Sequence, residues 1–146
     1  MITYKLIEPT KENSYLTEKL RLKSYGINPS PKDFDEYYIE NICNGTIIAI
    51  ICYNDNKPIG GCYISDTFNS IYIDYLFVLP EYQNKGLHIG RNILQYIFDN
   101  KSIIEEYYNK EFTQSKLYAT SPKTKALYKK IGYKEQQELL CKELGN

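Results

Sequence analysis

The segment from residue 78 to residue 91 contains the residue types that an anion-binding site needs. An apolar stretch ends at Leu79, a polar turn with Gly86 follows, and apolar residues at helical spacing begin at Ile89. The open N–H groups and positive dipole end of such a helix favour an anion, and a diphosphate is the obvious candidate. Gly86 and Gly90 would let the backbone approach a ligand closely. A plain strand-to-helix turn uses the same residue types, so both interpretations stay open.

Composition places the chain among ordinary globular domains and excludes several function classes. The 146 residues fit one domain (1–146), and 42% hydrophobic with 25% charged residues argue against a disordered chain. Eighteen basic and eighteen acidic side chains cancel, which removes the usual charge footprint of a nucleic-acid binder. The four cysteines lack CxxC spacing and indicate neither a zinc site nor a disulfide framework. The longest apolar run, 47–52, is far too short for a bilayer. We expect a soluble cytoplasmic protein without metal, nucleic-acid or membrane partners.

Strands and helices must alternate around the 78–91 segment to position it. Apolar patterning and turn residues predict strands over 2–8, 46–53, 59–65, 71–79 and 116–120, with one or two more within 133–144. Helices are predicted over 10–25, from Ser30 through Ile42, over 89–98 and over 122–131, with a further helical turn or two within 99–110. This order predicts a mixed α/β domain in which helices cover one sheet.

Residues 78–90 resemble motif A of the GNAT superfamily of acetyl-CoA-dependent N-acetyltransferases, V-x-P-x-x-[QR]-x-x-G-x-[GA]. Val78, Pro80, Gln83 and Gly86 match it. His88 stands where the family prefers Gly or Ala, or else the segment 87–90 holds two extra residues. We favour the insertion, because it aligns residues 93 and 94 with the apolar pair of the family helix.

A second segment, 121–133, is similar to the family pattern N-x-x-A-x-x-L-Y-x-K-x-G-[FY]. Its agreeing residues are Leu127, Tyr128, Lys130, Gly132 and Tyr133, whereas Ser121 replaces Asn and Thr124 replaces Ala. The resemblance implies the GNAT fold, a mixed and mostly antiparallel sheet that splays at the cofactor cleft, with helices on both faces. It also implies an acetyl-CoA site whose diphosphate is held by backbone N–H groups between residues 83 and 91. The implied cofactor contacts are Phe77, Val78, Leu79, Gln83, Asn84, Lys85, Gly86, Leu87, His88, Ile89, Gly90, Arg91 and Ser121.

The resemblance makes Tyr128 the general acid that protonates the departing CoA thiolate. A thiol with pKa about 8.5 and a phenol with pKa about 10 are close enough for this transfer. The alternative is a core tyrosine that packs against Leu127.

Asp74 is a candidate for the group that receives the proton of the acceptor amine. By two-residue alternation it shares a strand face with Val78, and a carboxylate there could take the amine's proton through water. An amine with pKa about 10.4 must lose that proton before it attacks. An ion-paired or edge-exposed aspartate is an equally good interpretation, and Tyr72 on the same face could line the pocket.

In the family, main-chain groups freed at a bulge near 77–79 bind the pantetheine, and one N–H polarises the thioester carbonyl. His88 is expected at the start of the helix or against the cofactor, far from the thioester. No acid or histidine patterns with the cysteines, so an acyl-cysteine route is disfavoured.

We therefore interpret the chain as an N-acetyltransferase that passes acetyl from acetyl-CoA directly to a primary amine of a small molecule or peptide, as a monomer or homodimer. Transfer of another acyl group, and an acyl-CoA-binding sensor or interaction module without turnover, remain alternatives. Zero net charge disfavours a tRNA-acetylating toxin. In this fold the segment 25–34 is expected to wall the acceptor pocket. Asp33, Asp35 and Glu36 either compensate a helix dipole or, if one points inward, favour a cationic acceptor.

Overall fold

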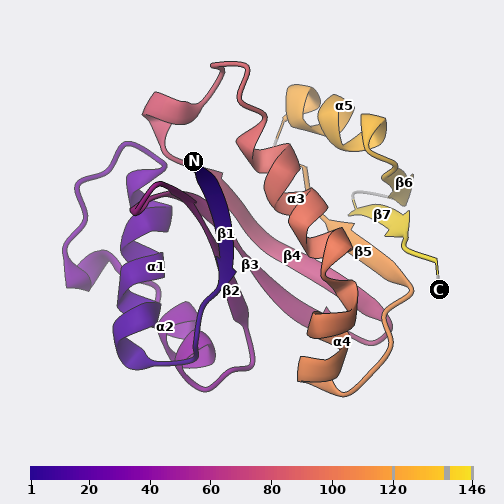
Figure 1. Cartoon of the computed structure of the whole chain (residues 1–146), viewed down its shortest axis with the longest axis horizontal. Helices are drawn as coiled ribbons and strands as arrows, with labels where there is room; N and C mark the ends of the chain where they lie inside the picture. Colours follow the sequence, from indigo (N-terminus) through magenta and orange to yellow (C-terminus); the bar gives the residue numbers. More distant parts are fainter. Residues whose placement is uncertain (120, 137–138, 146) are drawn as a thin grey trace. The chain divides into compact units, whose positions relative to one another are not determined.

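The computed structural model describes residues 1–119, 121–136 and 139–145, and its elements follow the predicted order (Figure 1). The elements are β1 (Ile2–Leu6), α1 (Lys11–Lys23), the 3-10 turn η1 (Pro31–Asp33), α2 (Glu36–Cys43), β2 (Ile48–Asn54), β3 (Lys57–Thr67), β4 (Ser70–Val78), the 3-10 turn η2 (Pro80–Tyr82), α3 (Ile89–Asp99), α4 (Lys101–Tyr108), β5 (Gln114–Leu117), α5 (Pro122–Lys130), β6 (Lys134–Gln136) and β7 (Leu139–Glu143). The predicted strand 116–120 begins two residues earlier than expected, and its expected last residue, Thr120, lies outside the described residues. None of the described helices is long and apolar enough to cross a membrane.

The strands form one open sheet in the order β1-β2-β3-β4-β5-β7-β6. β1 with β2, β2 with β3, β5 with β7 and β6 with β7 are antiparallel, whereas β4 and β5 are parallel. The β4–β5 pairing covers only Ser70–Ile73 against Gln114–Leu117, and β4 continues to Val78. The predicted mixed α/β sheet with helices against it is thereby confirmed.

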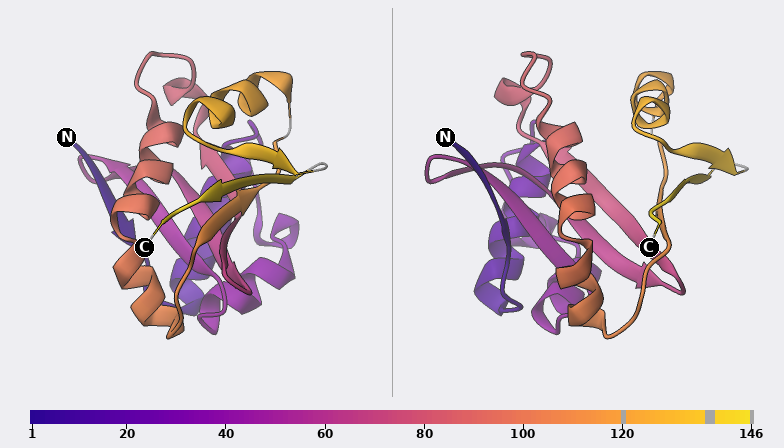
Figure 2. Two further views of the ribbon diagram at one scale, coloured as in Figure 1. Left: turned by 90° about the vertical axis from the view of Figure 1, so that its right-hand side faces the viewer. Right: turned by 45° about the vertical axis from the view of Figure 1, so that its right-hand side comes forward.

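The chain divides into two compact units, one of residues 1–64 and 75–99 and the other of residues 65–74 and 100–146. In the first unit, helices cover both faces of the strands (Figure 2). Leu20 of α1 and Ile42 of α2 join a buried cluster with Tyr63 and Phe77. On the other face Tyr96 of α3 stacks on Tyr4, with ring centroids 5.3 Å apart.

The second unit is built around β5, β7 and β6. Tyr133 and Phe112 are fully buried there, and the Ser115 and Tyr133 hydroxyls hydrogen-bond at 2.8 Å. The capping box of Ser121 with Thr124 starts α5, and Tyr128 is the buried residue of that helix. The α5 helix thus presents Tyr128 to this core.

The predicted helix from Ser30 to Ile42 is wrong in its first turn. The Asp33 carboxylate accepts from the Ser30 N–H at 2.9 Å in a capping box that starts η1, and η1 ends after one turn. Phe34 is then extended, with ψ 142°, and Asp35 caps a separate helix, α2. The Asp35 N–H donates to buried Glu18 at 2.8 Å. A helix continuous through Asp35 would turn that N–H toward the preceding turn instead, so this tertiary bond favours the break.

Candidate functional site

The loop between β4 and α3 has an alternating backbone conformation. Asn84, Gly86 and His88 have positive φ angles of 56°, 73° and 52°, and α3 begins at Ile89. Backbone that alternates in this way turns successive N–H groups toward one side and makes an anion-binding concavity. The sequence contains no sign of a positive φ at Asn84 or His88, because asparagine and histidine adopt one less often than glycine.

The N–H groups of this loop are available to a ligand. Among the described residues, none of the N–H groups from Lys85 to Arg91 donates to a protein acceptor. The exposed side chains of Lys85 and Arg91 add positive charge beside them. Unpaired N–H groups, a helix N-terminus and two cations together match the chemistry of a diphosphate.

The two glycines of the loop have open space where a side chain would begin. A Cβ built at Gly86 meets no atom within 4 Å, and one at Gly90 meets only Leu76 Cδ2 at an ordinary 3.7 Å. Packing therefore does not require glycine at either position, although the φ of Gly86 favours it.

The end of β4 is fixed by two hydrogen bonds that limit its free main-chain groups. Gln83 Nε2 donates to the Val78 carbonyl at 2.7 Å, and the Leu79 N–H donates to the Ile59 carbonyl at 2.8 Å. Gly60 allows the strands to approach, because a Cβ there would lie 2.7 Å from the Phe77 carbonyl oxygen. Phe77 and Leu79 thus face β3, and the Val78 N–H between them faces the opposite edge of β4. Sequence reasoning missed the need for glycine at position 60.

Tyr128 lies in the second unit, 9% exposed, with its ring edge-on to Tyr133 at 6.0 Å. Burial raises its pKa above the ordinary value of a phenol. Tyr128 thus has a packed ring and a hydroxyl group that stays protonated at neutral pH.

Asp74, also in the second unit, accepts a hydrogen bond from the Ser65 hydroxyl at 2.7 Å. Burial, helped by the charge of Asp74, raises the pKa of neighbouring Tyr72 to about 12. Tyr72 in turn meets Tyr118 edge-on at 6.1 Å. Asp74 thus lies beside the hydroxyl groups of Ser65 and Tyr72.

Several polar residues singled out in the sequence are engaged in helix capping. Ser121 accepts from the Thr124 N–H at 3.2 Å as the N-cap of α5. Asp33 accepts from the Ser30 N–H in the capping box of η1, and Asp35 accepts from the Tyr37 N–H at 3.0 Å. The dipole and capping interpretation of these two acids is therefore the one that their contacts support.

An open hollow of about 390 Å³ lies in the first unit, beside the segment between α1 and α2. Its lining comes from the end of α1, that segment, the start of β3 and the end of β4: Lys23, Gly26, Ile27, Asn28, Lys57, Leu79, Pro80 and Glu81. The Nζ of Lys57 lies 3.6 Å from a Glu81 carboxylate oxygen, which leaves Lys23 as the unbalanced charge of the lining. The acids Asp33, Asp35 and Glu36 do not line it.

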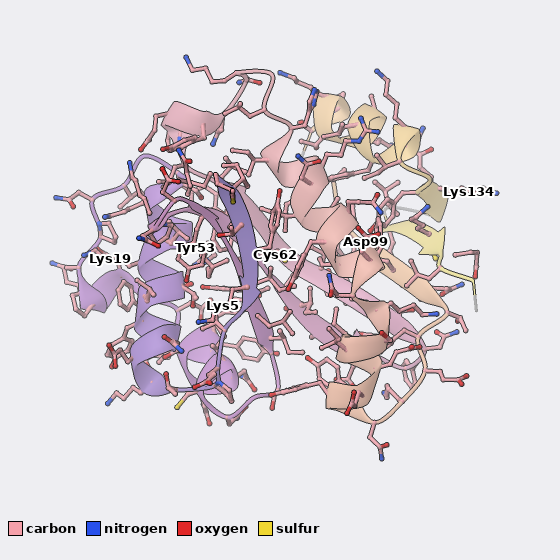
Figure 3. The ribbon with its side chains drawn as sticks, in the orientation of Figure 1. Lys5, Lys19, Tyr53, Cys62, Asp99 and Lys134 are labelled. Atoms are coloured by element: carbon pink, nitrogen blue, oxygen red, sulfur yellow. The ribbon has the colours of Figure 1, made fainter. Side chains whose placement is uncertain are left out.

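None of the four cysteines, all of them described, forms a disulfide; Cys43 is exposed, whereas Cys52, Cys62 and Cys141 are buried. Cys62 lies within the strands (Figure 3). Burial raises the pKa of Cys52 to about 11, which disfavours its thiolate. This agrees with the expectation that the buried cysteines are structural.

Sequence reasoning missed a buried charge network on α1. The Glu18 carboxylate, fully buried, is held by the Arg21 Nε at 2.7 Å and Nη2 at 2.8 Å. Burial alone would raise the pKa of Glu18, but the hydrogen bonds and charge of Arg21, with the Asp35 N–H, bring it below its ordinary value. The sequence signal that could have revealed it is a set of polar residues at helical spacing, which the structure places on the buried face of α1: Ser14, Thr17, Glu18 and Arg21.

This network predicts a pH-dependent stability. The pKa of Glu18 is lower in the folded chain than its ordinary value of 4.5, so its stabilising contribution is present above about pH 4.5 and is lost as the pH falls through the folded value. We expect the Tm of the wild type to fall more steeply below pH 4.5 than the Tm of Glu18→Gln, measured by calorimetry between pH 7 and pH 3. Parallel curves for the two proteins would contradict this role of Glu18.

The candidate residues fall into both compact units. Residues 77–79 and 83–91 belong to the first, and Asp74, Ser121 and Tyr128 belong to the second.

Known proteins resemble this chain in sequence family and in fold. The family model described as Acetyltransferase (GNAT) domain matches residues 45–135. The chain is similar to the PaiA N-acetyltransferase from Thermoplasma acidophilum in complex with coenzyme A, at 17% identity and TM-score 0.63 over 97% of this chain and 99% of that one. It is also similar to the ribosomal-protein-S18-alanine N-acetyltransferase from Escherichia coli, at 13% identity and TM-score 0.71 over 100% of this chain and 96% of that one. A third similar structure is a predicted acetyltransferase with acetyl-CoA from Clostridium acetobutylicum, at 19% identity and TM-score 0.65 over 94% of this chain and 93% of that one. No curated protein matches the chain.

At these identities the solved structures show a shared fold, the GNAT fold. The family model covers more than half of the chain, and its match includes the loop with unpaired N–H groups. The chain belongs to the GNAT family of acetyltransferases.

Proposed function

We propose that this protein transfers acetyl from acetyl-CoA directly to a primary amine of a small molecule or peptide. The observation that carries the proposal is the β4–α3 loop, where N–H groups without protein acceptors run from Lys85 to Arg91. A diphosphate satisfies such donors, and CoA contains one. Acetyl-CoA would supply the activated acetyl thioester. The four cysteines form no disulfide, which fits a cytoplasmic location.

The end of β4 would bind and polarise the thioester. The Val78 N–H faces away from β3, so we assign it the role of donor to the thioester carbonyl. Leu79 is unsuited to this role, because its N–H is already bonded to Ile59. One donor of this kind is worth roughly 2.7–4 kcal/mol of transition-state stabilisation.

Two side chains would handle protons. Tyr128 would protonate the leaving thiolate, and its burial keeps the phenol in the acid form at neutral pH. Asp74, which accepts a hydrogen bond from the Ser65 hydroxyl, would accept the amine's proton through water.

The acceptor would enter the hollow beside the segment between α1 and α2. Gly26, Ile27 and Asn28 of that segment line the hollow together with Leu79. Because Asp33 and Asp35 are used as caps, their contacts no longer support a preference for cationic acceptors. We therefore leave the acceptor as an amine, with small molecules and peptides as its two classes.

Calorimetry tests the cofactor part of the proposal. We expect acetyl-CoA to bind, and acetyl-pantetheine, which lacks the diphosphate-nucleotide half, to bind far more weakly. The physical reason is that only the diphosphate can satisfy the N–H groups of residues 85–91. Equal affinities would remove this loop from the cofactor site.

Turnover then separates the enzyme from the alternative, a sensor that binds acyl-CoA without reaction. A panel of amines, including polyamines, aminoglycosides, amino acids and peptides, would be incubated with acetyl-CoA and followed by acetylated product and released thiol. Retention of Tyr128 at the place of the family's general acid favours the enzyme. Tight acetyl-CoA binding with no product from any amine would favour the sensor.

A further inference from the structure

We propose that Glu18 and Arg21 are positioning residues that fix the segment between α1 and α2 against β4 and thereby set the affinity for the acceptor. The proposal rests on the function proposed above. It concerns the first compact unit alone, to which all the residues of the network belong.

Glu18 connects three parts of this unit through one carboxylate. Its Oε1 accepts from the Arg21 Nε and from the Tyr63 hydroxyl, at 2.7 and 3.0 Å. Its Oε2 accepts from the Arg21 Nη2 and the Asp35 N–H, both at 2.8 Å. Helix α1, strand β3 and the start of α2 are therefore joined at a site with no solvent exposure.

Arg21 extends the network to β4. Its guanidinium carbon lies 4.4 Å from the centre of the Tyr75 ring, and Tyr25 and Tyr38 flank it at 5.8 Å each. The side chain is 8% exposed, so these cation–π contacts are largely desolvated. Tyr75 lies two residues before Phe77, in the strand that we assign to the thioester.

The network holds the segment between the helices at both of its ends. Arg21 anchors the last turn of α1, and the Asp35 N–H anchors the start of α2. Between these anchors, residues 26–28 line the hollow that we assign to the acceptor. A change in the network would therefore move the wall of that hollow while leaving the β4–α3 loop unchanged.

Stability alone is a weak reason for such a pair. Replacing a buried ion pair by apolar residues of similar volume is often neutral or stabilising, whereas removing one partner leaves a costly buried charge. A bidentate guanidinium–carboxylate pair differs from apolar packing in its fixed geometry. Apolar side chains at positions 18 and 21 would therefore fill a similar volume, but they would not fix the orientation of the segment between α1 and α2.

The double variant Glu18→Leu with Arg21→Met tests this difference. We expect it to fold with a lower Tm than the wild type, because the Tyr63 hydroxyl and the Asp35 N–H lose their acceptor, and to bind acetyl-CoA with unchanged affinity. We expect kcat/KM for the acceptor to fall roughly 10²-fold, mainly through KM, as misplacement of a binding wall can do. Arg21→Lys keeps the charge but loses the bidentate contact with Glu18 and the stacking on the tyrosine rings, so it should also raise the acceptor KM. Lys19→Met is the matched control, because Lys19 is an exposed cation of the same helix (Figure 3).

Hydrogen exchange of the amides of residues 26–35 gives a readout that needs no turnover. In the double variant we expect exchange there to rise, relative to Lys19→Met, by more than it rises in the strands of the same unit, where only the change in global stability acts. A rise no larger than that in the strands, or a wild-type acceptor KM, would show that the pair only packs and would overturn the proposal. If the wild type acetylates no amine, the proposed function fails, whereas the exchange measurement still decides the positioning role.

Discussion

Tyr128→Phe is expected to lower kcat about 10²-fold and to leave acetyl-CoA affinity unchanged, if the phenol is the general acid. Burial raises the pKa of Tyr128, so the acid form persists at and above pH 10 but its proton is harder to give up. The proton transfer from Tyr128 to a thiolate is therefore energetically uphill. The loss of kcat in Tyr128→Phe should then lie near the lower end of the range of about 10²- to 10⁴-fold that is usual for a general acid. Steady-state kinetics over the pH range 6–10.5, with calorimetry for the cofactor, measures both quantities.

Tyr107→Phe is a suitable control, because it removes an exposed tyrosine hydroxyl from the same compact unit. The ring of Tyr128 contacts Tyr133 edge-on, and phenylalanine keeps this contact. The Tm of Tyr128→Phe should therefore stay close to that of the wild type. A wild-type kcat at every pH would mean that Tyr128 only packs in the core.

Gly86→Val is expected to weaken acetyl-CoA binding strongly while the fold is kept. The residue has φ +73° and no atom within 4 Å of a built Cβ. A β-branched residue in this conformation costs of order 1–3 kcal/mol or moves the loop, and its side chain would occupy the space in which we place the diphosphate. Calorimetry with acetyl-CoA, together with the Tm, measures the two effects separately.

Gly145→Val provides a matched control for backbone strain. Gly145 has φ +72° and equally open surroundings, but it is remote in sequence from the loop. The two variants should lose similar stability, and only Gly86→Val should lose acetyl-CoA affinity. Gly90→Ala avoids the strain: it should raise helix stability by about 1 kcal/mol and still reduce cofactor affinity. Normal acetyl-CoA binding by both loop variants would place the diphosphate elsewhere.

The sequence allowed the element order and the β4–α3 loop to be predicted, because both depend on local patterns. Apolar periodicity located α3, and Gly86 indicated the turn before it. The break between η1 and α2 was not predictable locally, since it depends on the bond from the Asp35 N–H to a carboxylate 17 residues earlier. In the structure Asp35 caps α2, and the tertiary bond of its N–H group decides between one helix and two.

The charge network and the close approach of β3 to β4 also depend on distant contacts. Tyr63 reaches Glu18 across 45 residues of sequence. Gly60 is required because the Phe77 carbonyl lies against it, which no window of sequence reveals. The roles of Tyr128 and Asp74 came from the motif and from strand position, and both remain predictions that the experiments above address.

The exposure pattern of the thiols affects how acetyl transfer should be measured. Only Cys43, the last residue of α2, is exposed among the four cysteines. A disulfide reagent that detects released CoA will therefore also react with one thiol of each enzyme molecule, in a fast step proportional to enzyme concentration. Cys43→Ser would remove this background. In the wild type, the same thiol offers a single attachment point for a fluorescent dye on α2, the helix whose start is tied to Glu18.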